Sequence, residues 1–210
     1  MIIMVCDNIE ELGEDFVAWA ETVLPDWRKE QMLAIKHLRG RVQCAVAWLL
    51  VHHCQMSEGG LFTCGECSRK LGSRRGAARN DSWIYNEHGK PFFEGRDDLF
   101  FSISHCKGAV AVAIDDKEVG VDIEEISRYR ESLESYVLNE EEVPRCARND
   151  KLRAECFIEI WTQKEAVFKL LGTGITHDIK DVLKNHPEVN VYSERIGNKI
   201  LSVATYNQMT

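Results

Sequence analysis

Residues 99–124 read LFFSISHCKGAVAVAIDDKEVGVDIE, and this stretch decides the fold class. Three runs of apolar, mostly β-branched or aromatic residues, at 99–104, 109–114 and 119–124, are separated by short polar turns. Runs of this length and composition between turn residues are typical of neighbouring strands. The turn at Lys107-Gly108 is a tight connection, which favours an antiparallel pair. The stretch therefore predicts three consecutive strands.

Helical patterns surround this block of strands. Apolar residues recur near every third or fourth position before it and after it, which is typical of amphipathic helices. The helices predicted on this basis cover residues 8–24, 26–54, 131–138 and 152–171, although Gly40 weakens the continuity of the second one. Further strands are predicted at the apolar N-terminus, at 83–85, at 92–93, and in a hairpin formed by 189–194 and 199–205. Separate groups of helices and strands indicate the α+β class.

The composition and net charge exclude several classes of protein. The chain has 210 residues, 44% hydrophobic and 29% charged, which fits one soluble domain or two small ones. No apolar run reaches membrane-spanning length and the N-terminus lacks a basic lead-in, so we expect a cytoplasmic protein without a membrane partner. The net charge of −8 argues against nucleic acid as a partner. The eight cysteines are expected to be mostly reduced thiols.

The strand at 119–124 carries two carboxylates. Side chains alternate across a strand, so Asp122 and Glu124 share one face, and Gly120 leaves space beside them. Carboxylates about 7 Å apart on one face can hold a hard cation from one side. The alternative is an ordinary half-exposed strand whose polar residues face water.

Two other segments carry candidate functional residues. In the helix that contains WTQKEAVFK, residues 161–169, Trp161, Glu165 and Lys169 fall on one stripe, where Glu165 and Lys169 can equally form a plain surface ion pair. His105 follows the strand residues Ser102 and Ser104. A histidine at a strand end suits a phosphate, because imidazole can donate a charge-assisted hydrogen bond, but such residues are often structural.

Taken together, these motifs resemble those of the 4′-phosphopantetheinyl transferases. The resemblance rests on VGVDIE at 119–124 and WTQKEAVFKLLGTGI at 161–175, with GKP at 89–91 and FSISH at 101–105 in the expected order upstream. It covers residues 83–176 and is closest to the larger members of the family, which are built from two halves. Residues 140–142 are all Glu and compete for the position of one family glutamate.

The resemblance implies a role for each matching residue. Asp122, Glu124 and Glu165 would bind Mg²⁺, and Lys169 would contact phosphate or orient Glu165. On the side of coenzyme A, the co-substrate, the implied contacts are Ser104, His105, Lys90, Pro91, and Arg41 or the competing Arg39. The Gly172-Thr173-Gly174 segment would make the turn after the catalytic helix.

The resemblance also implies a fold and a reaction. Two similar α+β halves, residues 1–115 and 116–210, would form a pseudo-dimer with the active site in the cleft between them. A serine of an apo acyl or peptidyl carrier protein would attack the β-phosphorus of coenzyme A and release adenosine 3′,5′-bisphosphate. Glu165 is the candidate base, acting directly or through a metal-bound water. We expect the protein to be a monomer.

Residues 56–81 have no counterpart in this resemblance. They are rich in glycine and basic residues, which favours a loop. Cys64 and Cys67 have the spacing of zinc ligands, with His52, His53 and Cys54 upstream, but a single Cys-x-x-Cys is a weak signal for zinc. A nucleic-acid contact through the basic residues lacks interleaved aromatics. A non-catalytic binding protein on the same fold is the remaining alternative.

Overall fold

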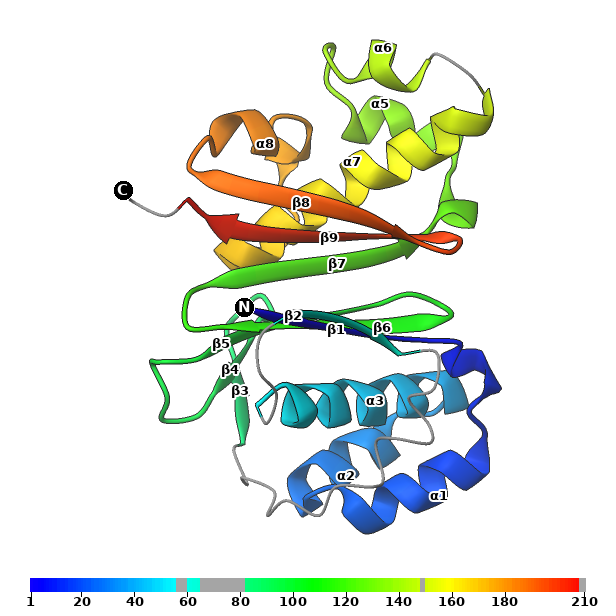
Figure 1. Cartoon of the computed structure of the whole chain (residues 1–210), viewed down its shortest axis with the longest axis vertical. Coiled ribbons are helices and arrows are strands. Elements are labelled where there is room, and N and C mark those ends of the chain that lie inside the picture. The colour runs from blue at the N-terminus through cyan, green and yellow to red at the C-terminus, as the bar shows by residue number, and fades with distance from the viewer. Residues whose placement is uncertain (56–59, 65–81, 148–149, 208–210) are drawn as a thin grey trace.

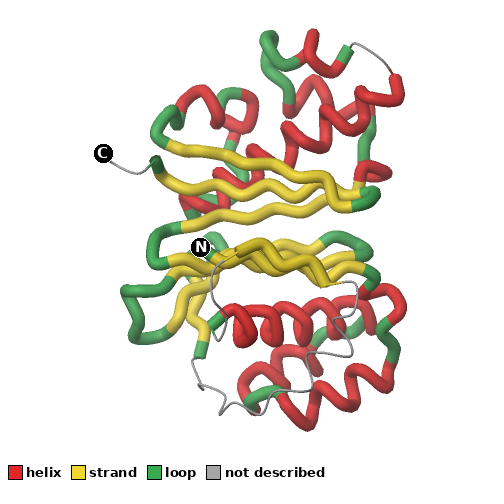
Figure 2. The backbone as a smooth tube through the Cα atoms, viewed as in Figure 1, coloured by secondary structure: helices red, strands yellow, loops and turns green. Residues whose placement is uncertain are grey.

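The computed structural model describes residues 1–55, 60–64, 82–147 and 150–207. Two sheets lie face to face in the middle of the molecule, and helices cover the outer side of each (Figure 1). The tube in Figure 2 shows the same order of layers, helix, sheet, sheet, helix. The expected α+β class is confirmed.

The N-terminal sheet has the strand order β2-β1-β6-β5. Its strands are β1 (Ile2–Asp7), β2 (Gly60–Cys64), β5 (Phe100–His105) and β6 (Ala109–Asp115). The central strand β1 pairs with β2 in parallel and with β6 antiparallel. Helices α1 (Glu14–Val23), α2 (Asp26–Ala34) and α3 (Leu38–Cys54) cover it, and a small hairpin of β3 (Trp83–Tyr85) and β4 (Pro91–Phe93) lies beside β5.

The C-terminal sheet has the order β7-β9-β8 and is antiparallel. It consists of β7 (Val119–Glu125), β8 (Val189–Ile196) and β9 (Lys199–Tyr206), with the long helix α7 (Asp150–Leu171) packed on its outer face. Shorter elements complete this part: η2 (Ile126–Arg128), η3 (Glu131–Leu133), α5 (Glu134–Val137), α6 (Val143–Cys146), η4 (His177–Lys180) and α8 (Val182–Asn185).

Strand alternation determines which side chains lie between the two sheets. On β6, the small side chains of Ala109, Ala111 and Ala113 pack against the C-terminal sheet, whereas the residues between them pack in the core that α3 covers. On β7, the apolar set Val119, Val121 and Ile123 faces the N-terminal sheet. Asp122 and Glu124 are thereby left on the side of β7 that faces α7.

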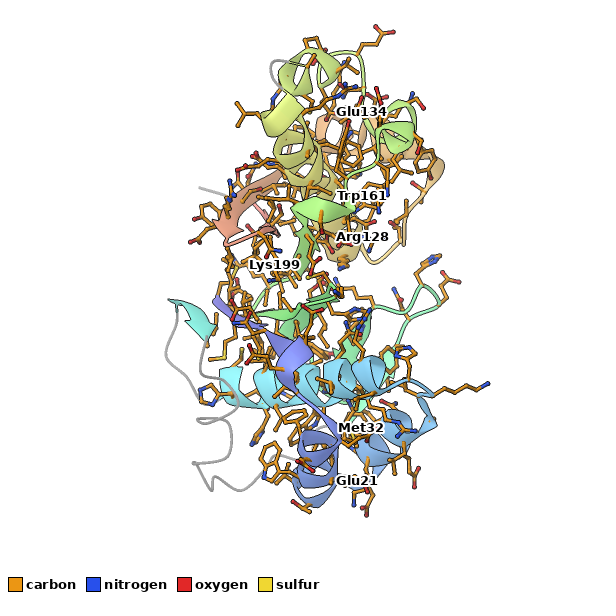
Figure 3. All side chains as sticks on the ribbon, turned by 90° about the vertical axis from the view of Figure 1, so that its right-hand side faces the viewer. Glu21, Met32, Arg128, Glu134, Trp161 and Lys199 are labelled. Atoms are coloured by element: carbon orange, nitrogen blue, oxygen red, sulfur yellow. The ribbon has the colours of Figure 1, made fainter. Side chains whose placement is uncertain are left out.

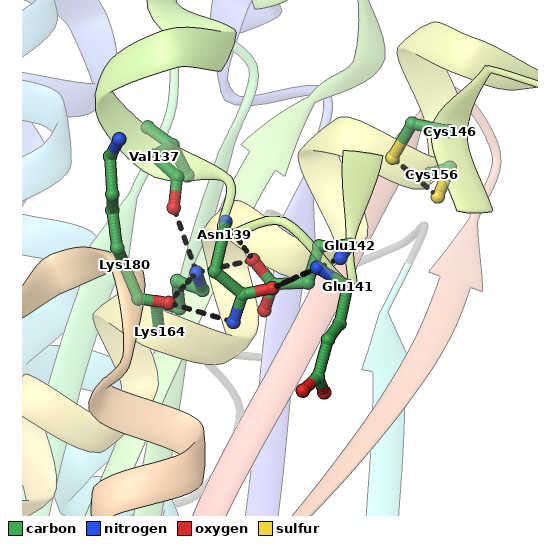
Figure 4. Close-up of polar contacts among 8 residues, drawn as sticks. All are labelled: Val137, Asn139, Glu141, Glu142, Cys146, Cys156, Lys164 and Lys180. Carbon is green, nitrogen blue, oxygen red and sulfur yellow. Dashed lines mark hydrogen bonds and ion pairs between the residues drawn. The ribbon is translucent and has the colours of Figure 1, made fainter. Parts of the chain in front are cut away.

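The segment between β7 and α7 is anchored to that helix by a buried lysine (Figure 4). The Lys164 ammonium, completely buried, donates to the carbonyls of Val137 and Lys180 at 2.8 and 2.7 Å and to the Glu142 carboxylate at 2.6 Å. Glu142 also accepts from the backbone N–H of Asn139 at 2.9 Å. Of the three consecutive glutamates, Glu142 is therefore the one with a defined internal role.

Several expected elements differ from those in the structure. The single helix expected over 26–54 is wrong: α2 ends at Ala34, and α3 starts at Leu38 after His37 accepts a hydrogen bond from the Gly40 N–H. A side chain at Gly40 would collide with the His37 ring, so glycine here permits the break between the helices. The loop expected over 56–81 is wrong for 60–64, which form β2. The remainder of that stretch, with Cys67, lies outside the described residues.

Other expected elements are confirmed, with changed ends. The strands around residues 83–125 and the C-terminal hairpin form as expected. The helix expected from residue 8 starts only at Glu14, after the short turn η1 (Ile9–Glu11), and that expected over 131–138 is split into η3 and α5. Within the described ranges, none of the helices is both long and apolar enough to span a bilayer.

Candidate active site

Asp122 lies at the centre of the candidate site. Its carboxylate is buried, with 5% of the residue exposed, and its Oδ1 accepts hydrogen bonds from Ser104 Oγ and Lys169 Nζ, both at 2.7 Å. Its other oxygen, Oδ2, is buried and has no hydrogen-bond partner. An unsatisfied buried carboxylate oxygen is costly. Asp122 thus has one oxygen fixed and one available to a ligand.

Glu124 repeats this arrangement two residues further along β7. Its Oε1 accepts from Arg128 Nη1 at 2.9 Å, whereas its Oε2 is buried without a partner. Burial, reinforced by the charge of Asp122, raises the pKa of Glu124 to about 7. Figure 3 shows Arg128 at the level where the C-terminal and N-terminal parts of the chain meet.

Glu165, on α7, lies near the carboxylate of Asp122. A Cβ on Gly120 would lie 1.9 Å from the Ala166 carbonyl oxygen, so glycine allows the helix backbone to lie directly on β7. The space expected beside Gly120 is therefore occupied by the helix, which corrects that expectation. Burial and the charge of Asp122 raise the pKa of Glu165 to about 7.

Lys169 and His105 place nitrogen atoms beside these acidic groups. Lys169, in the last turn of α7, binds Asp122 across the gap between helix and strand. His105 ends β5, and the residue as a whole is exposed to solvent. Partial desolvation of its ring, together with the Lys169 charge, lowers the pKa of His105. The imidazole is therefore neutral near pH 7 and can accept or donate a hydrogen bond.

Serine hydroxyls join β5 to β7, which are not paired as strands. Ser102 Oγ accepts from the Val121 N–H at 3.0 Å, and Ser104 Oγ accepts from the Ile123 N–H at 3.2 Å. Because Ser104 also donates to Asp122, both the proton and an acceptor site of its hydroxyl are used internally. In this geometry the Ser104 hydroxyl orients Asp122, and its expected contact with a coenzyme A phosphate stays a prediction.

A cavity of about 210 Å³ opens next to these groups. Its walls come from the turn before β4, from β5, and from the end of α7, and they include the sequence-predicted residues Lys90, Pro91, Glu165 and Lys169. The ammonium of Lys90 does not point at the cavity as a free charge, because it is paired with Glu118. A larger open hollow, between the β6–β7 turn and the end of β9, contains none of the candidate carboxylates.

The two candidate arginines lie outside this cavity. Arg41 Nε donates to the Ile35 carbonyl at 2.8 Å and so closes the turn between α2 and α3. Arg39 is exposed near the start of α3 and acts electrostatically on Glu10 and Lys107, close to the turn that follows His105. Neither lines the cavity that Glu165 and Lys169 share.

The donor set suits a hard cation. Asp122 and Glu124 each present an unpartnered buried oxygen, and carboxylate oxygens are preferred by Mg²⁺. Among the described residues, no three His, Cys, Asp or Glu side chains form a ready cluster around one point. The three predicted ligands Asp122, Glu124 and Glu165 are therefore not gathered around one point in this structure, and Glu165 as a third ligand stays a prediction.

The sequence pattern did not single out some residues of the site. Arg128 pairs with Glu124, but nothing in a turn of mixed charge marks it as a partner of that residue. Glu118 and Asn86 contact Lys90 and the end of α7. Asn86, in the turn Asn86-Glu87-His88-Gly89, carried the one usable signal, since asparagine in turns often bonds nearby backbone groups.

Comparisons with known proteins identify the family of this chain. The profile of the 4′-phosphopantetheinyl transferase superfamily matches residues 118–208, which contain the three carboxylates and Lys169. The 4′-phosphopantetheinyl transferase gsp of Aneurinibacillus migulanus is 33% identical over 114 residues, 52% of this chain and 46% of that protein. AcpT of Escherichia coli (strain K12), also a 4′-phosphopantetheinyl transferase, is 30% identical over 131 residues, 60% of this chain and 67% of that protein.

The relatives differ in how much of their length the chain covers. A third relative, the 4′-phosphopantetheinyl transferase of Bacillus subtilis, is 28% identical over 96 residues, 45% of this chain and 43% of that protein. The chain thus spans about half the length of the Aneurinibacillus and Bacillus proteins, but two thirds of AcpT. On this coverage, the chain belongs to the 4′-phosphopantetheinyl transferase superfamily.

Proposed function

We propose that this protein transfers the 4′-phosphopantetheine group of coenzyme A to a serine of an apo acyl or peptidyl carrier protein, with Mg²⁺, and releases adenosine 3′,5′-bisphosphate. The observation that carries the proposal is the pair of unpartnered buried oxygens on Asp122 and Glu124, beside Lys169 and the cavity. Buried carboxylate oxygens without a hydrogen-bond partner are uncommon and costly, and two of them on neighbouring positions of one strand face favour a bound cation.

Asp122, Glu124 and Glu165 are the residues that would hold the cation. Bound there, Mg²⁺ supplies positive charge that polarises the pyrophosphate and offsets the charge that develops during phosphoryl transfer. Burial and the charge of Asp122 raise the pKa of Glu124 and of Glu165 to about 7, and a bound cation would favour the ionised form of both.

The other side chains position and stabilise charge. Lys169, fixed by Asp122 at 2.7 Å, presents an ammonium to an anionic substrate at the edge of the cavity. His105 offers a neutral imidazole as a hydrogen-bond donor to a phosphate oxygen. Glu165 is the candidate base for the serine proton, because its carboxylate lines the cavity beside Lys169.

For substrate binding, we propose that the cavity holds part of coenzyme A. Its volume is below the range of about 300–1,000 Å³ that is usual for pockets enclosing a whole drug-sized ligand, so the nucleotide would extend beyond it. Pro91 and the stem of Lys90, whose ammonium is paired with Glu118, would line that route, with Arg39 or Arg41 further out. Residues 1–115 and 116–210 would then be two similar halves, with the substrate in the cleft between them.

The direct test is to incubate the purified protein with coenzyme A, Mg²⁺ and several apo carrier proteins and to weigh the carriers. We expect one carrier at least to gain the mass of one phosphopantetheine group, and Asp122→Asn to abolish that gain. Coenzyme A binding by calorimetry without any modified carrier would instead indicate a binding protein on the same fold. Absence of both binding and transfer would refute the proposal.

A further inference from the structure

The C-terminal end of α7 is held by a segment that is distant in sequence. A helix leaves its last four carbonyls without helical partners, and they carry the negative end of the helix dipole. At the end of α7, Gly172 closes the helix with φ +70 and donates to the Phe168 carbonyl at 2.9 Å. Lys169, whose ammonium donates to Asp122, lies within this last turn.

Lys90 binds one of these terminal carbonyls. Its ammonium donates to the Leu170 carbonyl oxygen at 2.7 Å and pairs with the Glu118 carboxylate. Lys90 is 8% exposed, whereas the Glu118 side chain is 31% exposed. A buried cation at a helix C-terminus is doubly favourable, because it satisfies an open carbonyl and complements the helix dipole.

Asn86 binds the carbonyl of Gly172, the residue that follows the last residue of α7. Its Nδ2 donates to the Gly172 carbonyl oxygen at 2.8 Å, and its Oδ1 accepts from the N–H of Lys90 at 2.8 Å. A Cβ on Gly172 would lie 3.1 Å from both Asn86 and Lys90, so this turn fits closely against them. The turn before β4, the start of β7 and the end of α7 therefore meet at one point.

We propose that Lys90, Glu118 and Asn86 form a latch that positions Lys169 and the cavity wall, and that the Lys90 ammonium acts through α7 rather than as a contact for coenzyme A. The inference rests on the proposed function, which supplies its kinetic readout. The geometry supports this proposal, because the Lys90 ammonium binds the Leu170 carbonyl and the Glu118 carboxylate. Leu170 is the residue directly after Lys169. Loss of the latch loosens the turn that carries Lys169 and leaves the nucleotide contacts in place.

The kinetic test compares Lys90→Met with Glu118→Gln, because only the latch predicts that they behave alike. We expect both to lower kcat by about tenfold or more, as is typical when a charged group loses its position, with the coenzyme A dissociation constant nearly unchanged. The double variant should be little worse than either single one, because both remove the same interaction. Arg195→Gln, which breaks an exposed ion pair to Glu155 near the N-terminal end of α7, is the matched control and should leave kcat unchanged.

A coenzyme A contact predicts a different pattern. If Lys90→Met weakens coenzyme A binding, kcat recovers at saturating coenzyme A, and Glu118→Gln is normal, then Lys90 is a ligand and the latch is refuted. If the parent protein itself shows no transfer, the proposed function fails, and the latch is then decided by the following measurement, which needs no activity.

Hydrogen exchange of backbone amides measures whether the latch holds the end of α7. Backbone amides at 169–172 should exchange faster in Lys90→Met and Glu118→Gln than in the parent, whereas amides at 157–162 of the same helix should not change. Asn86→Ala removes the hydrogen bonds of the Asn86 side chain to Gly172, His88 and Lys90 but leaves the Lys90 ammonium in place, and it serves if Lys90→Met does not fold; it should also speed exchange at 169–172. Unchanged exchange at 169–172 in the folded variants would overturn the proposal.

Discussion

Replacing Glu165 by glutamine should make the metal-free protein more stable and less active. Glu165 is half-buried near Asp122, and its pKa is raised to about 7 from the ordinary value of 4.5. Folding therefore disfavours the ionised form of this side chain. Glutamine has nearly the same shape and carries no charge, so the variant escapes this cost.

The sign and the pH window follow from the two pKa values. Below pH 4.5 the carboxyl is protonated in both the folded and the unfolded protein, and Glu165 contributes no pH dependence. Between pH 4.5 and 7 the folded state retains more protons, so stability falls as pH rises, and above pH 7 the loss is constant. The shift corresponds to about 3 kcal/mol at most.

The assay is urea unfolding of the parent and of Glu165→Gln, with a chelator present, at pH 5 and pH 8. We expect the variant to be more stable by about 2–3 kcal/mol at pH 8 and by much less at pH 5. Adding Mg²⁺ should stabilise the parent more than the variant, because the parent has the complete set of carboxylates. Transfer activity should be lost in the variant.

A matched control lies on the same helix. Glu155→Gln removes an exposed ion pair with Arg195 and should change stability by at most about 1 kcal/mol, in the destabilising direction. If metal-free Glu165→Gln is no more stable than the parent at pH 8, or if its advantage is the same at pH 5, the reasoning about the buried carboxylate is wrong.

Three further outcomes are expected. Gly120→Ala should cost about 1–3 kcal/mol or more in thermal unfolding, because its Cβ would collide with the Ala166 carbonyl; unchanged stability would contradict the close approach of α7 to β7. His105→Ala should weaken coenzyme A binding in calorimetry without a change in thermal stability, because the residue ends a strand at the surface; equal affinity would exclude His105 from the binding site. Arg145→Glu, on exposed α6, should raise KM for an acidic carrier protein at low salt and lose this effect at high salt, because exposed charges are screened; equal KM values at low salt would place docking elsewhere.

The sequence alone determined the elements in which short-range rules dominate. Alternation along 119–124 predicted that Asp122 and Glu124 share a face, and they do, because residues two apart in a strand always point the same way. The tight turn at Lys107-Gly108 predicted the antiparallel pair of β5 and β6, since tight turns depend on local backbone preferences. Glu165 and Lys169 were identified by the motif, and their helical spacing placed both on one side of α7.

Tertiary structure decided what those residues contact. The sequence predicted open space beside Gly120, but the backbone of α7 fills that space. The contact is with Ala166, 46 residues away, and no local pattern predicts it. The lysine at position 90 matched a motif, yet its ammonium binds Leu170 and Glu118, and no local pattern encodes a contact across 80 residues. Likewise, the Ser104 hydroxyl orients Asp122 because β5 and β7 lie side by side. Local spacing fixes which way a side chain points, whereas burial, charge and partners arise only when distant segments pack together.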